Sequence, residues 1–194
     1  MQDVFALDRF VIRKKVLKLF GGAFHVYDAD DNLVGYSKQK AFKLKEDIRL
    51  FRDEDMTEPL LVIGARSVID FSAAYDVIDP RTSEHVGSLR RLGFTSMLRD
   101  SWEILDAHEN VIGKIEEDST LKAVVRRVGD ASWLFPQAFH ADVNGQTVFI
   151  AKQRFNPFVA KIDLDFSMDT GRLLDRRLGL GAAVLLAAIE GRQN

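Results

Sequence analysis

Four stretches of the chain share one pattern, in which an apolar run, a short polar turn opened by aspartate and a second apolar run follow one another. The turns begin at Asp28, Asp79, Asp106 and Asp142. An aspartate side chain accepts hydrogen bonds from the backbone of such a turn, and Asn or Gly adopts positive φ where the chain reverses. The pattern therefore predicts four β-hairpins, and Asn144-Gly145 is the strongest hairpin signal among them.

A glycine follows the turn in three of these stretches, at Gly35, Gly87 and Gly113. Glycine inside a strand marks a bulge or a close approach of another backbone. The aspartates are separated by 51, 27 and 36 residues, and a solenoid requires a fixed period. The spacing therefore favours a sheet built from repeated hairpins. Further strands are expected elsewhere, for example where Lys161–Phe166 alternates between polar and apolar residues.

Two segments have helical rather than strand periodicity. Leu121–Val128 carries apolar residues at helical spacing after the N-cap signal Asp118-Ser119, which predicts an amphipathic surface helix. The second segment, Leu173–Ile189, is expected to be a helix opened by Asp169 or Thr170.

From Leu178 onward this C-terminal segment is apolar on every side, as in a helix deep inside a core or a membrane. Its longest run without charge, Leu178 to Ile189, has 12 residues, whereas a bilayer span needs about 20. Gly179 and Gly181 each cost about 1 kcal/mol of helix propensity, which a closely packed wall would explain. A helix threaded through a β-barrel meets these demands.

Composition excludes several classes of protein. With 194 residues, 46% of them hydrophobic, and a formal net charge of −2, the chain is expected to form one folded domain over residues 1–194. It has no cysteine, which excludes disulfides, thiol catalysis and cysteine-ligated zinc and fits a reducing compartment. No targeting segment or global basicity is present, so we expect a soluble, cytoplasmic protein without a transmembrane segment or a nucleic-acid partner.

Charge is unevenly distributed along the sequence. Residues 1–52 hold 11 basic and 7 acidic residues, a balance of +4. Either the segments mix in space and the asymmetry has no consequence, or the basic residues form a face for an anionic partner such as a lipid headgroup. The second interpretation predicts a ligand-binding set consisting of Lys14, Lys38, Lys40, Lys43 and Lys45.

Signatures of catalysis are missing. The sequence contains no phosphate-binding loop, no His-Glu-x-x-His and no Gly-x-Ser-x-Gly. His25, His108 and His140 lie near the hairpin aspartates, so they are either a His/Asp metal site or, more simply, polar surface. The acidic turn after Asp28 lacks the glycine and glutamate that a calcium loop requires. We therefore predict no catalytic residue, no metal and no cofactor.

Several of these features resemble the tubby-like C-terminal superfamily, and in particular the LURP-one-related proteins and the bacterial relatives of phospholipid scramblases. The resemblance rests on the aspartate hairpins with terminal glycine and on three segments, namely Ser37–Lys45, Gly87–Arg91 and Asp175–Leu178. It covers about residues 10–190. It implies a mainly β fold, a closed antiparallel barrel of about twelve strands that encloses the hydrophobic C-terminal helix, with one further surface helix.

The resemblance also implies a function. Tubby proteins bind phosphoinositides through basic residues, and scramblases are linked to lipid movement and calcium. We expect a non-enzymatic binding or scaffold module that associates with anionic phospholipid, peripheral to the membrane. Two alternatives remain open, an enzyme with polar groups converging at a barrel mouth and a protein-interaction module that uses a sheet edge or the acidic segment near Asp53. The oligomeric state is left open.

Overall fold

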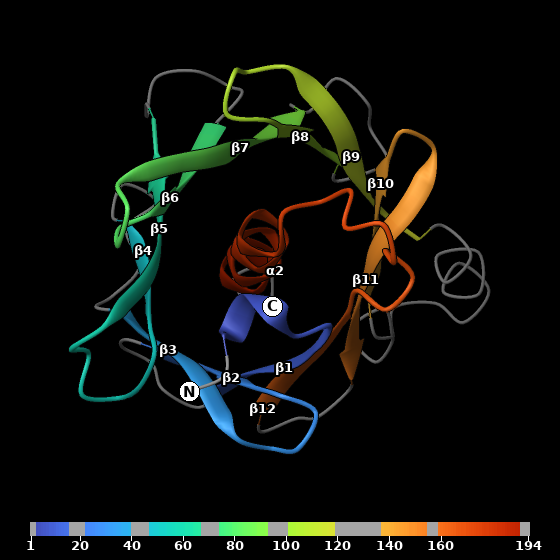
Figure 1. Ribbon diagram of the computed structural model, residues 1–194. Helices are drawn as coiled ribbons and strands as arrows, with labels where there is room; N and C mark the ends of the chain where they lie inside the picture. Colours follow the sequence, from blue (N-terminus) through green and yellow to red (C-terminus); the bar gives the residue numbers. More distant parts are fainter. Residues whose placement is uncertain are drawn as a thin grey trace.

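In the residues that it describes, the structure, a computed structural model, forms a closed antiparallel barrel of twelve strands with an α-helix along its axis (Figure 1). It describes residues 3–15, 22–39, 47–66, 74–92, 101–118, 137–154 and 159–190. The predicted mainly β barrel around the C-terminal helix is confirmed. The predicted surface helix over 121–128 lies outside the described residues.

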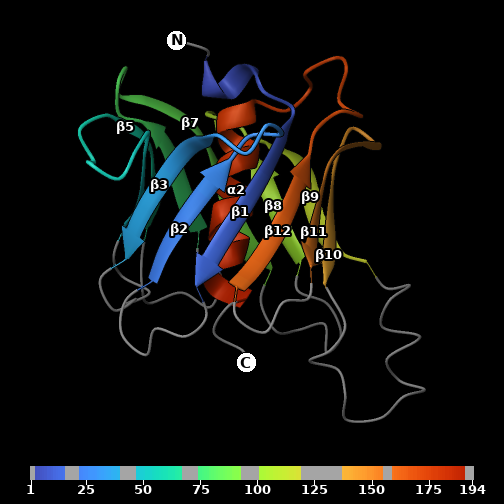
Figure 2. The ribbon, with the colours of Figure 1, turned by 90° about the horizontal axis from the view of Figure 1, so that it is seen from below.

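Each strand pairs with its neighbours in sequence, and β12 closes the ring by pairing with β1, where Phe10 faces Leu164. The elements are η1 Val4–Ala6, β1 Arg9–Lys15, β2 Gly22–Tyr27, β3 Leu33–Gln39, β4 Ile48–Phe51, β5 Pro59–Ala65, β6 Ala74–Asp79, β7 Glu84–Leu92, β8 Ser101–Leu105, β9 Val111–Glu117, β10 Ala138–Val143, β11 Gln146–Arg154, β12 Val159–Asp165 and α2 Arg176–Glu190. Figure 2 shows η1 at the end of the barrel where α2 begins, which we call the proximal end. The distal end is the one where α2 ends.

All four predicted hairpins are present, as β2–β3, β6–β7, β8–β9 and β10–β11. In the first, Asp28 Oδ1 accepts hydrogen bonds from the backbone N–H groups of Asp30, at 2.9 Å, and Asn32, at 2.8 Å. Asp106 holds the β8–β9 turn in the same way. In the β2–β3 turn the residue with positive φ is Asp31 rather than Asn32, whereas in the β10–β11 turn Asn144 and Gly145 have positive φ as expected.

Each of the four hairpins contains a bulge, and in three of them the bulge lies directly before the glycine that follows the turn. The register shifts after Val77, which faces Gly87, and a Cβ on Gly87 would lie 2.4 Å from the carbonyl oxygen of Leu105. A Cβ on Gly113 would lie 2.3 Å from the carbonyl oxygen of Asp142. Both glycines therefore mark the bulges and close approaches that the sequence predicts, and bulges increase the local twist that a barrel needs.

Helix α2 fills the lumen. The side chains from Leu178 to Ala188 are all buried, and Leu180 and Val184 have no exposed surface. Gly179 packs so closely on the wall that an added Cβ would lie 2.5 Å from Cε1 of Phe166. At Gly181 it would lie 3.1 Å from Cγ2 of Val77. The two glycines thus allow the surrounding side chains to approach the helix closely. This close packing explains why the helix contains them in spite of their cost in helix propensity.

The helix begins at Arg176, three residues later than the predicted Leu173. Asp169 does not cap it, because its carboxylate accepts hydrogen bonds from the N–H groups of Leu173 and Leu174 in a preceding turn, at 2.8 and 3.2 Å. Asp175 caps α2 instead, since its Oδ1 accepts the N–H of Arg177 at 2.8 Å. A carboxylate there also interacts favourably with the helix dipole.

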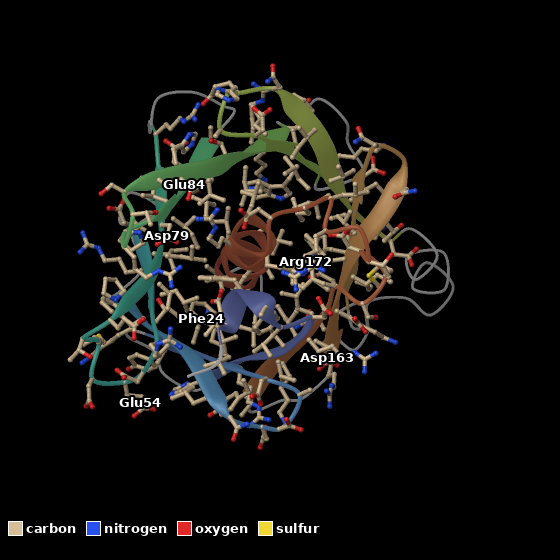
Figure 3. All side chains as sticks on the ribbon, viewed as in Figure 1. Phe24, Glu54, Asp79, Glu84, Asp163 and Arg172 are labelled. Atoms are coloured by element: carbon tan, nitrogen blue, oxygen red, sulfur yellow. The ribbon has the colours of Figure 1, made fainter. Side chains whose placement is uncertain are left out.

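Two arginines in the first turn of α2 bind carboxylates at the proximal end of the barrel. Buried Arg176 donates from Nη1 to Asp169 Oδ2 at 2.7 Å and from Nη2 to Asp8 Oδ1 at 3.0 Å. Its neighbour Arg177 donates to Glu84 Oε2 at 2.6 Å and contacts Asp79 Oδ2 at 3.3 Å. Asp79 and Glu84 stand on the β6–β7 side of the ring (Figure 3). The helix is therefore fastened to the wall at its N-terminus.

These ion pairs alter the acidity of the carboxyl groups. A hydrogen bond from Arg81 to the carboxylate, together with that from Arg177, lowers the pKa of Asp79. Burial by itself would raise the pKa of Asp169, but hydrogen bonds from Leu173, Arg176 and Leu174 outweigh burial and lower it. Both carboxylates therefore stabilise the folded state in their ionised form.

Replacing Gly179 by alanine is expected to destabilise the barrel by about 1–3 kcal/mol, because the new methyl group would overlap the buried Phe166 ring. The clash outweighs the gain of about 1 kcal/mol in helix propensity. Urea unfolding followed by circular dichroism measures the change. Gly171→Ala is the matched control, since its Cβ would meet nothing closer than Leu173 at 3.9 Å. Equal stability of the two variants would contradict the packing argument.

The free energy of unfolding is expected to fall on acidification. A carboxyl whose pKa is lowered by folding stabilises the protein above its unfolded pKa of about 4, and this contribution is lost as the pH falls through the folded value. Asp79→Asn should therefore lower stability at pH 7 and flatten its decline below pH ~4. Asp55→Asn is the control, because Asp55 is exposed and has no ion-pair partner among the described residues. If the free energy of unfolding of Asp79→Asn depended on pH in the same way as that of the parent protein, the stabilising role assigned to the ionised Asp79 carboxylate would be refuted.

Candidate functional site

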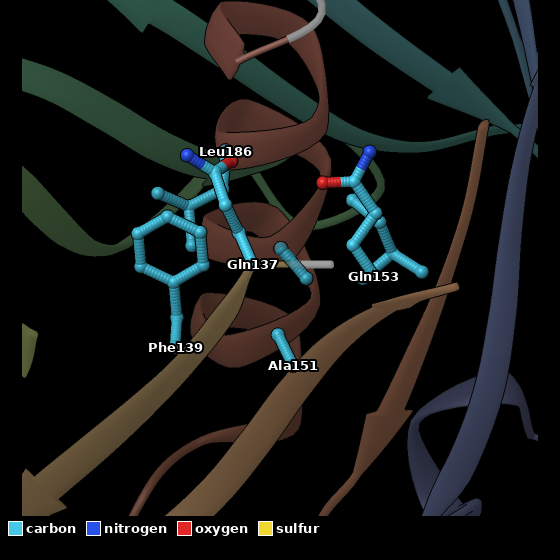
Figure 4. A pocket seen from close by; sticks show the side chains of 7 residues that line it. Gln137, Phe139, Ala151, Gln153 and Leu186 are labelled. Atoms are coloured by element: carbon cyan, nitrogen blue, oxygen red, sulfur yellow. The ribbon is translucent and has the colours of Figure 1, made fainter. Parts of the chain in front are cut away.

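An apolar slot lies between the distal half of α2 and the inner faces of β10, β11 and β12 (Figure 4). The slot is small: it measures about 290 Å³ only when open solvent is counted, and the centre of a water-sized molecule can occupy about 20 Å³ of it. It is lined by Gln137, Phe139, Ala151, Gln153, Ile162, Ala183 and Leu186. Five of these seven side chains are apolar, so the slot offers a hydrophobic surface beside the packed lumen.

The predicted basic residues are only partly described. Lys38 follows buried Ser37 on β3 and is exposed on the outer face of the wall. Lys14 occupies the inner register of β1, where it pairs with Phe24 and its Nζ lies 5.1 Å from the centre of that ring. Both lie near the distal end, but they belong to opposite faces of the wall. Lys40, Lys43 and Lys45 lie outside the described residues.

Three further basic residues lie on neighbouring strands of the distal wall. Lys152 and Arg154 are exposed on β11, and Lys161 lies on β12, where Arg154 is its cross-strand partner. Arg154 forms an ion pair with Asp163, which raises the pKa of the guanidinium. The prediction missed these residues because they are 110 or more positions away from Lys38 in sequence. The balance of +3 in residues 120–194 is the signal that points to them.

A polar cluster on the outer wall joins Arg66, Asp76, His85, Ser88 and Glu109. Arg66 donates from Nε to Asp76 Oδ1 at 2.6 Å and from Nη1 to Glu109 Oε2 at 2.7 Å. Ser88 Oγ donates to Asp76 Oδ1 at 2.7 Å. The hydrogen bonds to Glu109 and Asp76 raise the pKa of Arg66, and the bond from Arg66 lowers that of Glu109.

This cluster contains the residue types of a serine hydrolase without the geometry. In a catalytic triad the serine and the aspartate bind different ring nitrogens of the histidine. Here Ser88 Oγ, at 3.1 Å, and Asp76 Oδ1, at 3.2 Å, both contact His85 Nε2. Ser88 is also buried beneath the cluster. The arrangement therefore stabilises the wall and does not present a nucleophile.

The same cluster has the composition of a cation site. Ligand atoms of Asp76, His85 and Glu109 lie within 4.8 Å of one another. Arg66, however, already donates to both carboxylates, so its guanidinium balances the charge that a metal ion would balance. A metal would have to displace this arginine, and we assign the cluster a structural role.

The three histidines near the hairpin aspartates have separate environments. His25 Nε2 lies 2.7 Å from Glu54 Oε1, rather than beside Asp28. His108 is exposed in the β8–β9 turn. His140 Nε2 lies 3.7 Å from Asp142 Oδ2 and 4.0 Å from Glu116 Oε2. The sequence places His140 near Asp142 on the same strand, but it could not assign Glu54 and Glu116, because these neighbours come from other segments of the chain.

Within the described residues, no helix has the length and hydropathy needed to cross a bilayer. Comparison with known proteins identifies no relative: no protein-family model, no curated protein and no solved structure matches the chain. The resemblance to the tubby-like superfamily therefore stays a prediction.

Proposed function

We propose that the chain is a non-enzymatic binding module of the tubby-like type, which associates with anionic phospholipid through the distal end of its barrel. The supporting observation is a set of basic residues at this end, on the neighbouring strands β11, β12 and β1 and on β3. They are Lys14 on β1, Lys38 on β3, Lys152 and Arg154 on β11, and Lys161 on β12. The proposal extends to a cytoplasmic protein peripheral to the membrane.

The sequence adds further basic residues after β3. This strand ends at Gln39, at the distal end, and it is followed in sequence by Lys40, Lys43 and Lys45, which lie outside the described residues. Each basic residue near an anionic membrane contributes about 1 kcal/mol. Since Lys14 and Lys38 belong to opposite faces of the wall, only some of the set can contact one flat surface. The expected association is therefore weak and sensitive to salt.

The alternatives have less support from the geometry. The enzyme hypothesis lacks a nucleophile in the Ser88 cluster, where one histidine nitrogen serves both partners. Recognition through a free sheet edge is not favoured, because the strands close into a ring and edge pairing needs an unpaired strand. An interaction through the acidic segment near Asp53 is not supported by any arrangement of the described residues.

Charge reversal in the distal wall tests the proposal. The parent protein is expected to sediment with liposomes in proportion to their anionic lipid content, at low ionic strength, and to dissociate as salt increases. Lys38→Glu combined with Lys152→Glu should reduce the bound fraction several-fold, because both side chains are exposed and lack an ion-pair partner among the described residues.

A double variant with the same change of charge elsewhere is the control. Lys114→Glu on β9 and Arg9→Glu at the proximal end of β1 leave the distal wall intact. This control should bind nearly as well as the parent protein. If both double variants lost the same fraction of liposome binding, the effect would come from net charge and not from the distal wall. If the parent protein bound neutral and anionic liposomes equally well, the proposal would be refuted.

A further inference from the structure

The strands of the ring are paired unevenly, and the junction between β3 and β4 has the least backbone pairing among the described strands (Figure 1). These two strands share one residue pair, Tyr36 with Phe51, whereas every other pair of neighbouring strands shares at least four. Continuing the register would join residues 37–39 to residues 48–50, but these described strand residues are not paired with each other. We call this junction the seam. With fewer backbone hydrogen bonds to break, it should open more easily than the rest of the wall.

Side chains close the inner side of the seam. Leu50 of β4 has no exposed surface, and its Cδ1 would lie 3.2 Å from a Cβ added to Gly35 of β3. The bare backbone at Gly35 thus lets Leu50 pack against β3. Ser37, on the same face of β3, is 1% exposed, and its Oγ has no hydrogen-bond partner among the described residues. A buried hydroxyl without a partner is destabilising, and opening the seam would restore its hydration.

A hydrogen bond spans the seam on its outer side. Glu54 lies in the turn between β4 and β5, and its Oε1 is 2.7 Å from Nε2 of His25 on β2. Because β3 lies between β2 and β4 in the ring, this contact joins the strands on either side of it. The His25 ring also packs edge-on against Tyr36, with the ring centres 5.1 Å apart. Figure 3 shows Glu54 on the outside of the ring.

The strands β4 and β5 form a hairpin with strong contacts of its own. At its turn, the guanidinium of Arg52 donates from Nε and Nη2 to the two carboxylate oxygens of Glu58, at 2.6 and 3.0 Å. The backbone N–H of Arg52 also donates to the carbonyl oxygen of Glu58 at 2.9 Å. Since these contacts do not involve β3, the hairpin keeps them when the seam separates.

We propose that the barrel opens reversibly at the seam, and that the hydrogen bond between Glu54 and His25 is a latch that holds it closed. In the open state the β4–β5 hairpin moves away from β3, and the inner face of the wall at Ser37 and Leu50 becomes accessible. The other junctions stay paired, so the ring opens at one place without unfolding. The inference goes beyond the proposed function, since it concerns how the ring itself opens.

A single introduced thiol can measure this opening, because the chain has no cysteine of its own. Ser37→Cys places the thiol at the seam. Ala141→Cys places it on β10, on the opposite side of the ring, at a position without exposed surface. In native buffer a thiol reagent should label Ser37→Cys about tenfold faster than Ala141→Cys or more, since local opening exposes the first and global unfolding the second. Equal labelling rates in two variants that melt like the parent protein would overturn the proposal.

Removing the latch tests the role of Glu54. Glu54→Ala should speed the labelling of Ser37→Cys roughly fivefold, the effect of losing one hydrogen bond, and should leave the labelling of Ala141→Cys unchanged. Asp55→Ala is the matched control, because Asp55 is exposed in the same turn and has no ion-pair partner among the described residues. Acceleration at both thiols, or the same acceleration by Asp55→Ala, would show general destabilisation and refute the latch.

Hydrogen exchange in protein without an introduced thiol supplies a second measurement, which holds even if a cysteine variant fails to fold. Peptides that cover β4 should exchange their amide hydrogens about tenfold faster than peptides that cover β8, whose pairing on both sides is continuous over several residues. Glu54→Ala should widen this difference and Asp55→Ala should not. Equal protection of the two strands, or no change on removing Glu54, would contradict opening at the seam.

Discussion

The fold depends on enclosing a helix that has no polar side. Leu180 and Val184 have no exposed surface, and every side chain from Leu178 to Ala188 is buried. Leaving one such large aliphatic side chain in water costs about 1.5–3 kcal/mol, so the helix is stable only inside the wall. The wall depends equally on the helix, because a ring of twelve strands is wider than its own side chains can fill. Helix and barrel therefore form one core.

Closing a wall around this helix requires curvature at regular positions. The four hairpins supply it with the same local device, in which an aspartate or its neighbours fix the turn and a bulge follows within a few residues. Gly87 and Gly113 allow another backbone to approach where a side chain would overlap it. The twist added at each bulge bends the sheet toward its partner strands, until β12 meets β1.

Features encoded within a few residues were predictable from the sequence, and features that join distant segments were not. The hairpins and the apolar helix are local, and so are the glycines that let the wall approach. The start of α2 was misplaced because Asp169 serves a separate turn, while Arg176 binds both Asp169 and Asp8, 168 positions away from it. A sequence pattern cannot show that a residue so far away will bind the same arginine as Asp169.

The candidate site was predicted in the same uneven way. The excess of basic residues in the N-terminal part is visible in the sequence, but the inner register of Lys14 and the outer position of Lys38 depend on the pairing of β1 with β2. The slot was not predictable, because it requires Ala183 of the helix to lie opposite Ala151 of β11. The cluster around Ser88 likewise needs three strands in register before its residues meet.

A filled lumen restricts where this barrel can recognise another molecule. The two ends differ in their chemistry: at the proximal end Arg176 and Arg177 are satisfied by carboxylates, so little charge is left for a ligand. At the distal end Lys38, Lys152 and Lys161 have no ion-pair partner among the described residues. The ion pairs at the proximal end hold the helix in place, while the lysines at the distal end stay accessible. A binding site is more selective when the elements that support it are rigid. This asymmetry supports the proposal that the distal end is the one that binds.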